Sequence, residues 1–227
     1  MGMPAMRNFG KPAAFWQAAC RGAVRLRCCQ KGVAAVEFAL ILPVMLLMYF
    51  GSAEVTKGIL VNRKVTIATR TISDLLAQTQ STPVTDLTIA QIFSAATAVM
   101  GPDATGLKMT LSSIKFVLHS GSSTNYDAKT MWSVTTTANS LRPCNVILTK
   151  DTSSTLVPDV NSVPAGFYTG AGTLVVADVT YIYPSPFSIN ASFYSSPGTL
   201  TFTRAYFNTP RNTNSIGYSG TSGTTCP

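Results

Sequence analysis

The sequence predicts an α+β protein in which one long N-terminal helix precedes an antiparallel β-sheet domain. An apolar run follows Gly32 and contains a single carboxylate, Glu37. An amphipathic stretch without proline continues directly from that run. Beyond residue 107 the chain changes to short runs rich in β-branched and aromatic residues, separated by turn-forming residues.

Positive charge is concentrated near the N-terminus of this 227-residue chain of net charge +8. Residues 1–32 carry six Lys/Arg and no acid, whereas residues 33–227 carry eleven Lys/Arg and nine Asp/Glu, which leaves 11 − 9 = +2. We interpret residues 1–32 as a basic cytoplasmic leader, in which 15–27 could form a short surface helix. The body has no basic stripe interleaved with aromatic residues, so we expect no nucleic-acid partner.

Residues 33–53 have the length of a membrane-spanning helix. At about 1.5 Å per residue they extend roughly 31 Å, close to the thickness of a hydrocarbon core. Glu37 lies near one end of this span, where a carboxylate can be hydrated or paired, and Pro43 removes one hydrogen bond and should bend the helix. Basic residues are equally numerous on the two sides. We place the N-terminus inside because the long Ser/Thr-rich domain follows the span.

Residues 54–79 are expected to extend the helix beyond the membrane. The apolar positions at helical spacing are Ile59, Leu60, Ala68, Ile72, Leu75 and Leu76, widened by Val61, Val65 and Ile67. A second helix is predicted over 86–100, with Asp86 as its cap and Gly101-Pro102 as its end.

Residues 80–227 complete an extracytoplasmic α+β domain in this interpretation. Strands are predicted over 107–119, 130–137, 146–149, 173–183 and 199–207, and their hairpin-like spacing favours an antiparallel sheet. The Asn/Thr/Ser/Gly-rich residues 208–227 are expected to form loop.

Two of the five cysteines, Cys144 and Cys226, follow the apolar run. A lone pair in an exported domain predicts one disulfide, which would contribute roughly 4 kcal/mol in the chain-entropy model. The alternative is a pair of unrelated free thiols.

Catalytic and metal chemistry find little support in the sequence. His119 is the only histidine, so a His-pair metal site and a Ser-His-Asp triad with a spare histidine are excluded. There is no CxxC pair and no phosphate-binding Gly-Lys loop. We therefore expect a protein that is not an enzyme and that needs no cofactor or metal.

The segment GVAAVEF, from Gly32 to Phe38, fits the processing pattern of type IV pilin-like precursors. The wider segment 32–70 resembles TadE-like proteins of tight-adherence pilus systems, with AVEFAL, then Leu-Pro at Pro43, then an apolar block with a glycine and a downstream acid. The resemblance implies cleavage between Gly32 and Val33 by a prepilin peptidase. It also implies that Glu37, followed by Phe38, pairs with the α-amine of Val33 on a neighbouring subunit, and that the sheet domain is pilin-like.

The function implied by this resemblance is that of a non-enzymatic minor pilin, or pseudopilin, in pilus assembly. Its partners would be the bacterial inner membrane, the prepilin peptidase, other pilin subunits and pilus assembly proteins, with the C-terminal domain in the periplasm. One alternative is an exported enzyme or periplasmic binding protein whose ordinary signal peptide is cut before Glu54. Another is a signal-anchored adhesin unrelated to pili, and Glu37 would then be a hydrated interfacial carboxylate.

Overall fold

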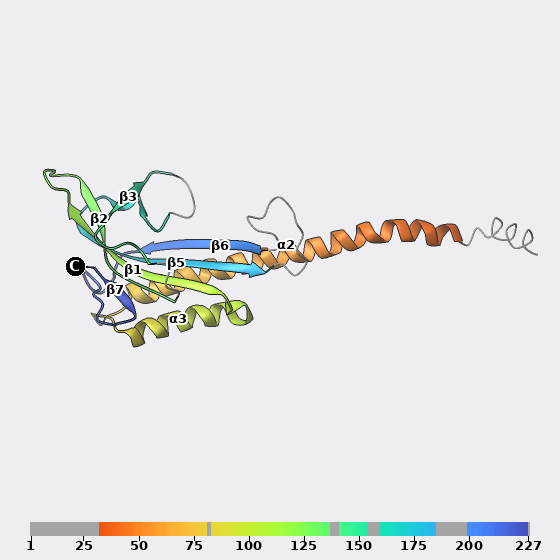
Figure 1. Ribbon diagram of the computed structural model, residues 1–227, viewed down its shortest axis with the longest axis horizontal. Coiled ribbons are helices and arrows are strands. Elements are labelled where there is room, and N and C mark those ends of the chain that lie inside the picture. Colours follow the sequence, from red (N-terminus) through yellow and green to blue (C-terminus); the bar gives the residue numbers. More distant parts are fainter. Residues whose placement is uncertain (1–31, 81–82, 137–140, 154–158, 185–198, 227) are drawn as a thin grey trace, which may run out of the picture. The chain divides into compact units, whose positions relative to one another are not determined.

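A computed structural model describes residues 32–80, 83–136, 141–153, 159–184 and 199–226 (Figure 1). The expected surface helix over 15–27 lies outside these residues. The chain divides into two compact units, 1–53 and 54–227, which are described separately below. The helices are α2 (Val33–Ala77), α3 (Asp86–Met100) and the short 3-10 helices η2 (Gly101–Ala104) and η3 (Ala165–Phe167). The strands are β1 (Leu107–Leu118), β2 (Tyr126–Thr135), β3 (Ile147–Asp151), β4 (Ser162–Pro164), β5 (Gly172–Pro184), β6 (Thr199–Asn208) and β7 (Gly223–Thr225).

Helix α2 is one helix of 45 residues with Pro43 inside it, so the apolar run and its amphipathic extension form a single element. From residue 54 onward it buries residues at intervals of three and four, as a helix packed on a core does. The buried positions are Glu54, Gly58, Val61, Val65, Ala68, Thr69, Ile72, Ser73, Leu76 and Ala77.

The prediction of which side of this extension is buried is partly wrong. Ile59, Leu60 and Leu75 are exposed, whereas Val61 and Val65 are buried. The buried face is the one that also holds Gly58, Ala68 and Ser73, where small side chains allow close packing. Apolar residues occur on several sides of this helix, so their periodicity alone did not select one face.

The N-cap of helix α3 lies one residue before the position that the sequence predicted. Thr85 is the N-cap and its side chain accepts a hydrogen bond from the Thr88 N–H, whereas Asp86 is the first helical residue. The expected cap at Asp86 is therefore wrong, and this carboxylate is used by the C-terminal segment instead. The end of the helix is confirmed, with Gly101 at φ 59° as the C-cap.

The sheet has seven strands in the order β4-β3-β2-β1-β5-β6, with β7 also paired to β2. All pairs are antiparallel except β3 with β4. The long strands β1, β5 and β6 lie side by side, with β6 at the edge of the sheet (Figure 1). The five predicted strands are confirmed within a few residues. Strands β4 and β7 were not predicted, and β7 lies in the segment that was expected to be loop.

The two faces of the sheet bury different cores. On β5, Val175, Ala177 and Val179 pack into the core that includes the buried residues of α2 and α3. Leu174 and Val176 point to the opposite face, into a smaller core with residues of β1, β2, β3 and β4. This alternation follows from the two-residue period of a strand. One helical layer therefore covers one face, and the β3–β4 region covers the other.

Candidate functional site

The first part of α2 carries an exposed apolar surface in which Glu37 is the one charged residue. Within the described residues, this is the one helix long and apolar enough to cross a membrane. Its large apolar side chains are all exposed: Val33, Val36, Phe38, Leu40, Ile41, Leu42, Val44, Met45, Leu46, Leu47, Met48, Tyr49 and Phe50. A surface of this kind marks contact with a membrane or another protein.

The predicted processing residues lie at the start of this helix. Gly32 precedes the helix and is exposed, and Val33, its first residue, is 56% exposed. Glu37 comes one turn after Val33 on the same side of the helix, and Phe38 beside it is 62% exposed. Pro43 lies further along the same helix. The peptide bond after Gly32 and the Glu37 carboxylate are thus both on an accessible helical end.

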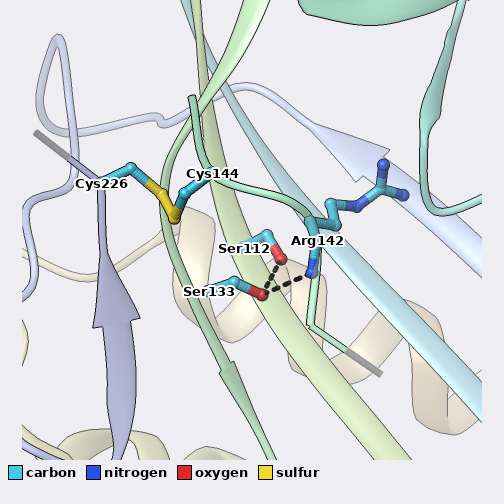
Figure 2. The surroundings of a disulfide bond; sticks show 5 residues. All are labelled: Ser112, Ser133, Arg142, Cys144 and Cys226. Carbon is cyan, nitrogen blue, oxygen red and sulfur yellow. Dashed lines mark hydrogen bonds between the residues drawn. A yellow bond between two sulfur atoms is a disulfide. The ribbon is translucent and has the colours of Figure 1, made fainter. Parts of the chain in front are cut away.

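Cys144 and Cys226 form a disulfide, with Cα atoms 5.2 Å apart (Figure 2). The Cys226 N–H donates to the carbonyl oxygen of Met131 on β2, at 2.7 Å. Strands β3 and β7 pair with different parts of the same edge of β2. The disulfide therefore links the segment before β3 to the segment after β7. It lies beside β2, the strand with which both β3 and β7 pair.

A buried polar chain lies next to the disulfide. The hydroxyls of Ser112 and Ser133 are 2.8 Å apart, and the backbone N–H of Arg142 donates to the Ser133 hydroxyl at 3.1 Å. Figure 2 shows that the Arg142 guanidinium points away from the disulfide. The guanidinium donates to both carboxylate oxygens of Asp178, at 2.9 Å each, and to the carbonyl oxygens of Val160 and Ser162.

Arg142 is 1% exposed, so this ion pair is removed from water. Burial of a charge is tolerated when its donors and acceptors are satisfied, as they are here. The pair fixes the segment that precedes Cys144 against β5. Sequence reasoning missed Arg142 and Asp178, because residues 36 positions apart leave no local pattern.

Asp86 connects the start of α3 with the C-terminal segment. Its carboxylate accepts hydrogen bonds from the Tyr218 hydroxyl and from the backbone N–H groups of Thr221, at 2.8 Å, and Ser222, at 3.3 Å. The Tyr218 hydroxyl, followed by these backbone donors, lowers the pKa of Asp86 from 3.8 to about 2. Tyr218 also stacks on Trp132, whose indole N–H donates to the Ile216 carbonyl oxygen. The contacts of Asp86 therefore serve the fold.

Glu54 is a residue that sequence reasoning did not single out as a site. It is 4% exposed, and in the part of the chain that the structure describes neither carboxylate oxygen has a hydrogen-bond partner. It lines a groove of about 220 Å³ between α2 and β6. The other lining residues are Val55, Gly58, Ile59, Asn62, Leu200 and Phe202. A buried carboxylate in a largely apolar groove is costly unless something pairs with it.

The described residues include no group of three or more His, Cys, Asp or Glu side chains placed to hold a metal ion. His119 contacts Asp127 through its Nδ1 atom at 2.9 Å, and its side chain is half exposed. Two features therefore remain as candidate sites. One is the apolar helix with the accessible Glu37 carboxylate, and the other is the groove that contains the buried Glu54 carboxylate. Both are suited to association.

Taken together, the fold and these sites define an α+β domain that follows one long apolar helix. Residues 32–73 match the family model of TadE-like proteins, so the chain contains a TadE-like domain at its N-terminal helix. The matched segment includes Gly32, Glu37, Pro43 and Glu54, and the sheet lies beyond it. No curated protein matches the chain, and neither does any solved structure.

Proposed function

We propose that this protein is a non-enzymatic, membrane-anchored minor pilin or assembly component of a tight-adherence pilus system. The observation that supports this most is the TadE-like match over residues 32–73. The matched segment includes Gly32, Val33 and Glu37, which lie at the start of an exposed apolar helix. That spacing serves both processing and subunit association.

In this proposal the leader 1–32 is cytoplasmic, 33–53 spans the inner membrane and the sheet domain is periplasmic. The extension 54–79 continues the helix into that domain. The disulfide between Cys144 and Cys226 suits an oxidising compartment such as the periplasm. The prepilin peptidase acts on the peptide bond between Gly32 and Val33.

Cleavage there creates a new ammonium group at the N-terminus of α2. The helix dipole places partial positive charge at the same end, so the new charge is disfavoured in an apolar environment without an anion. The Glu37 carboxylate of a neighbouring subunit supplies that anion, and each charge neutralises the other in the membrane. The pair then sets the register between adjacent helices, and Phe38 adds apolar contact beside it.

The N-terminus of the mature protein tests the processing step. We expect Val33 when the chain is produced with its prepilin peptidase, and an intact leader when the peptidase is absent. Mass spectrometry of the purified membrane protein measures both. A mature chain that starts at Glu54 would overturn the proposal, because that cut divides α2 within its continuous length and makes the segment a signal peptide. An intact leader in the presence of the peptidase would contradict processing.

A further inference from the structure

We propose that a pocket beside the turn of the β1–β2 hairpin binds an uncharged sugar ring at the end of a glycan chain. The pocket has a volume of about 280 Å³ and shares no lining residue with the Glu54 groove. It lies where β3 runs beside the first part of β2 (Figure 1). The pilus function proposed above plays no part in the argument.

The pocket opens onto the smaller core of the sheet. Leu148 on β3 lines it, is 2% exposed and belongs to that core, against which Tyr126 and Tyr168 also pack. Ile147, another lining residue, is 49% exposed. A ligand with one apolar face would remove this apolar surface from water, as ligands of small-molecule pockets do.

Tyr168 presents its ring to the pocket in a fixed orientation. Its hydroxyl donates to the Leu148 carbonyl oxygen at 3.1 Å, and Phe116 meets its ring edge to face, with centroids 5.2 Å apart. The Nζ atom of the exposed Lys150 lies 5.4 Å from the centroid of the Tyr168 ring. Such an exposed cation–π contact contributes only about 0.5–1 kcal/mol, so a ligand can replace the ammonium. The C–H groups of a sugar ring are weakly positive and pack on the same electron-rich face.

The polar lining carries one charge of each sign. Asp127 and Lys150 both line the pocket, so a simple anion meets the carboxylate and a simple cation meets the ammonium. The Nδ1 atom of His119 lies 2.9 Å and 3.1 Å from the two carboxylate oxygens of Asp127. Each of these oxygens keeps a second lone-pair direction for a ligand hydroxyl.

The neutral lining groups favour a sugar over a zwitterionic amino acid. Thr124 and Asn125 are exposed and line the pocket beside the two charged residues. An amino acid would use the two charges alone, whereas adjacent sugar hydroxyls both donate and accept. They can therefore donate to Asp127, accept from Lys150 and do both with the Asn125 amide.

The loop that supplies Thr124 and Asn125 is ordered by its own hydrogen bonds. The backbone N–H groups of both residues donate to the Ser122 hydroxyl, at 3.3 Å and 3.0 Å. The His119 N–H donates to the Asn125 carbonyl oxygen at 2.8 Å. Binding therefore requires little further ordering of the loop, which reduces its entropic cost.

The size and position of the pocket indicate a terminal sugar. Small-molecule pockets usually have volumes of about 300–1,000 Å³, so a pocket just below this range holds a single ring. Thr124, Asn125 and Lys150 are all exposed, and the rest of a glycan chain can leave the pocket into solvent between them.

The test uses full-length protein in phospholipid nanodiscs, because the head group of a sugar-based detergent would compete for the pocket. Labelled discs are applied to immobilised glycans that end in hexoses, in N-acetylhexosamines or in acidic sugars, with empty discs as the blank. We expect retention on glycans with a neutral end, and competition by the methyl glycoside of that terminal sugar. Free amino acids should not compete. Tyr168→Ala, Asp127→Asn and Lys150→Gln should each reduce retention by at least roughly tenfold, because each removes a direct contact with the ligand.

Tyr206→Ala is the matched control. Tyr206 also has a cation near its ring, since the guanidinium of Arg70 lies 5.5 Å from the ring centroid, but it does not line this pocket. Its loss should leave retention unchanged. Tyr168→Phe keeps the ring and should keep most of the binding. Where thermal unfolding shows that Tyr168→Ala does not fold, the exposed-site variants Asp127→Asn and Lys150→Gln decide.

Four outcomes would overturn the proposal. They are an absence of retention on every neutral glycan, retention on acidic glycans only, competition by amino acids in place of the methyl glycoside, and retention that is unchanged in Asp127→Asn and Lys150→Gln. The assay needs neither cleavage after Gly32 nor the Glu37 carboxylate, so its result is independent of the proposed pilus function.

Discussion

The Arg142 guanidinium holds both carboxylate oxygens of Asp178 at 2.9 Å, within the domain and two residues before Cys144. Loss of one partner leaves the other as an uncompensated buried charge. We predict that Asp178→Asn or Arg142→Ala lowers the free energy of unfolding by about 3–5 kcal/mol. Urea unfolding of the full-length protein in detergent measures this loss.

The matched control is the exposed ion pair between Arg211 and Asp74, at 3.2 Å. Because both side chains are solvated, Arg211→Ala should cost no more than about 1 kcal/mol. Equal losses for Arg142→Ala and Arg211→Ala would show that the burial of the Arg142 pair has no energetic consequence.

The disulfide gives a second prediction. It closes a loop with a sequence separation of 82, so Cys144→Ser should lower the free energy of unfolding by up to roughly 4 kcal/mol. Cys226→Ser should have the same effect, and the double variant should be no worse than either single variant, because one bond is lost in each case. Peptide mapping without reductant should recover Cys144 linked to Cys226. Recovery of both as free thiols from periplasmically exposed protein would refute the bond.

The Asp86 carboxylate gives a pH-dependent prediction. Its pKa in the folded protein, about 2, is below the ordinary value of 3.8, so the folded state favours the charged form. The associated stabilisation is present above about pH 4 and is lost as the pH falls towards 2. Unfolding measured across this range should show a steeper loss in the parent protein than in Asp86→Asn.

Tyr218→Phe is the complementary variant, because the Tyr218 hydroxyl is the largest cause of the lowered pKa. The pKa of Asp86 should rise towards 3.8 in this variant, and the loss of stability should begin at a higher pH. An unchanged carboxyl titration, followed by carbon-13 NMR of the Asp86 side chain, would argue against this hydrogen bond.

The Glu37 carboxylate gives a prediction about function. Glu37→Gln keeps the size of the side chain but removes the charge that, in the proposed function, pairs with the Val33 ammonium of a neighbouring subunit. We expect normal membrane insertion and cleavage but a strong loss of pilus assembly, scored by electron microscopy and by membrane fractionation. Unchanged piliation would make Glu37 a bystander.

The sequence predicted correctly those elements that are determined by a pattern of neighbouring residues. The long helix follows from a continuous apolar run joined to an amphipathic one, and strand β5 follows from its run of β-branched residues. Strands β4 and β7 have three residues each, too few to show a period. Thr85 and Asp86 are both favourable capping residues, so only the tertiary contact of Asp86 with Tyr218 separates their roles.

The residues of the candidate site also fall into those that a local pattern identifies and those that only the folded structure identifies. Gly32 and Glu37 are recognisable because their spacing is local. Glu54 ends an apolar run, where a carboxylate is normally solvated, and its groove needs Leu200 and Phe202, which are nearly 150 residues away in sequence. Such a site exists only after the sheet has folded against α2.

The pairing of β7 with β2 sets a temporal order on export, if the domain is periplasmic as proposed. Residues Trp132 to Val134 present an unpaired strand edge until Gly223 to Thr225 arrive. Because Cys226 follows β7, its disulfide can form only after every strand of the sheet has crossed the membrane. A periplasmic chaperone or thiol oxidase that recognises the open edge would therefore act on a nearly complete domain, and a stalled chain would remain exposed to proteases.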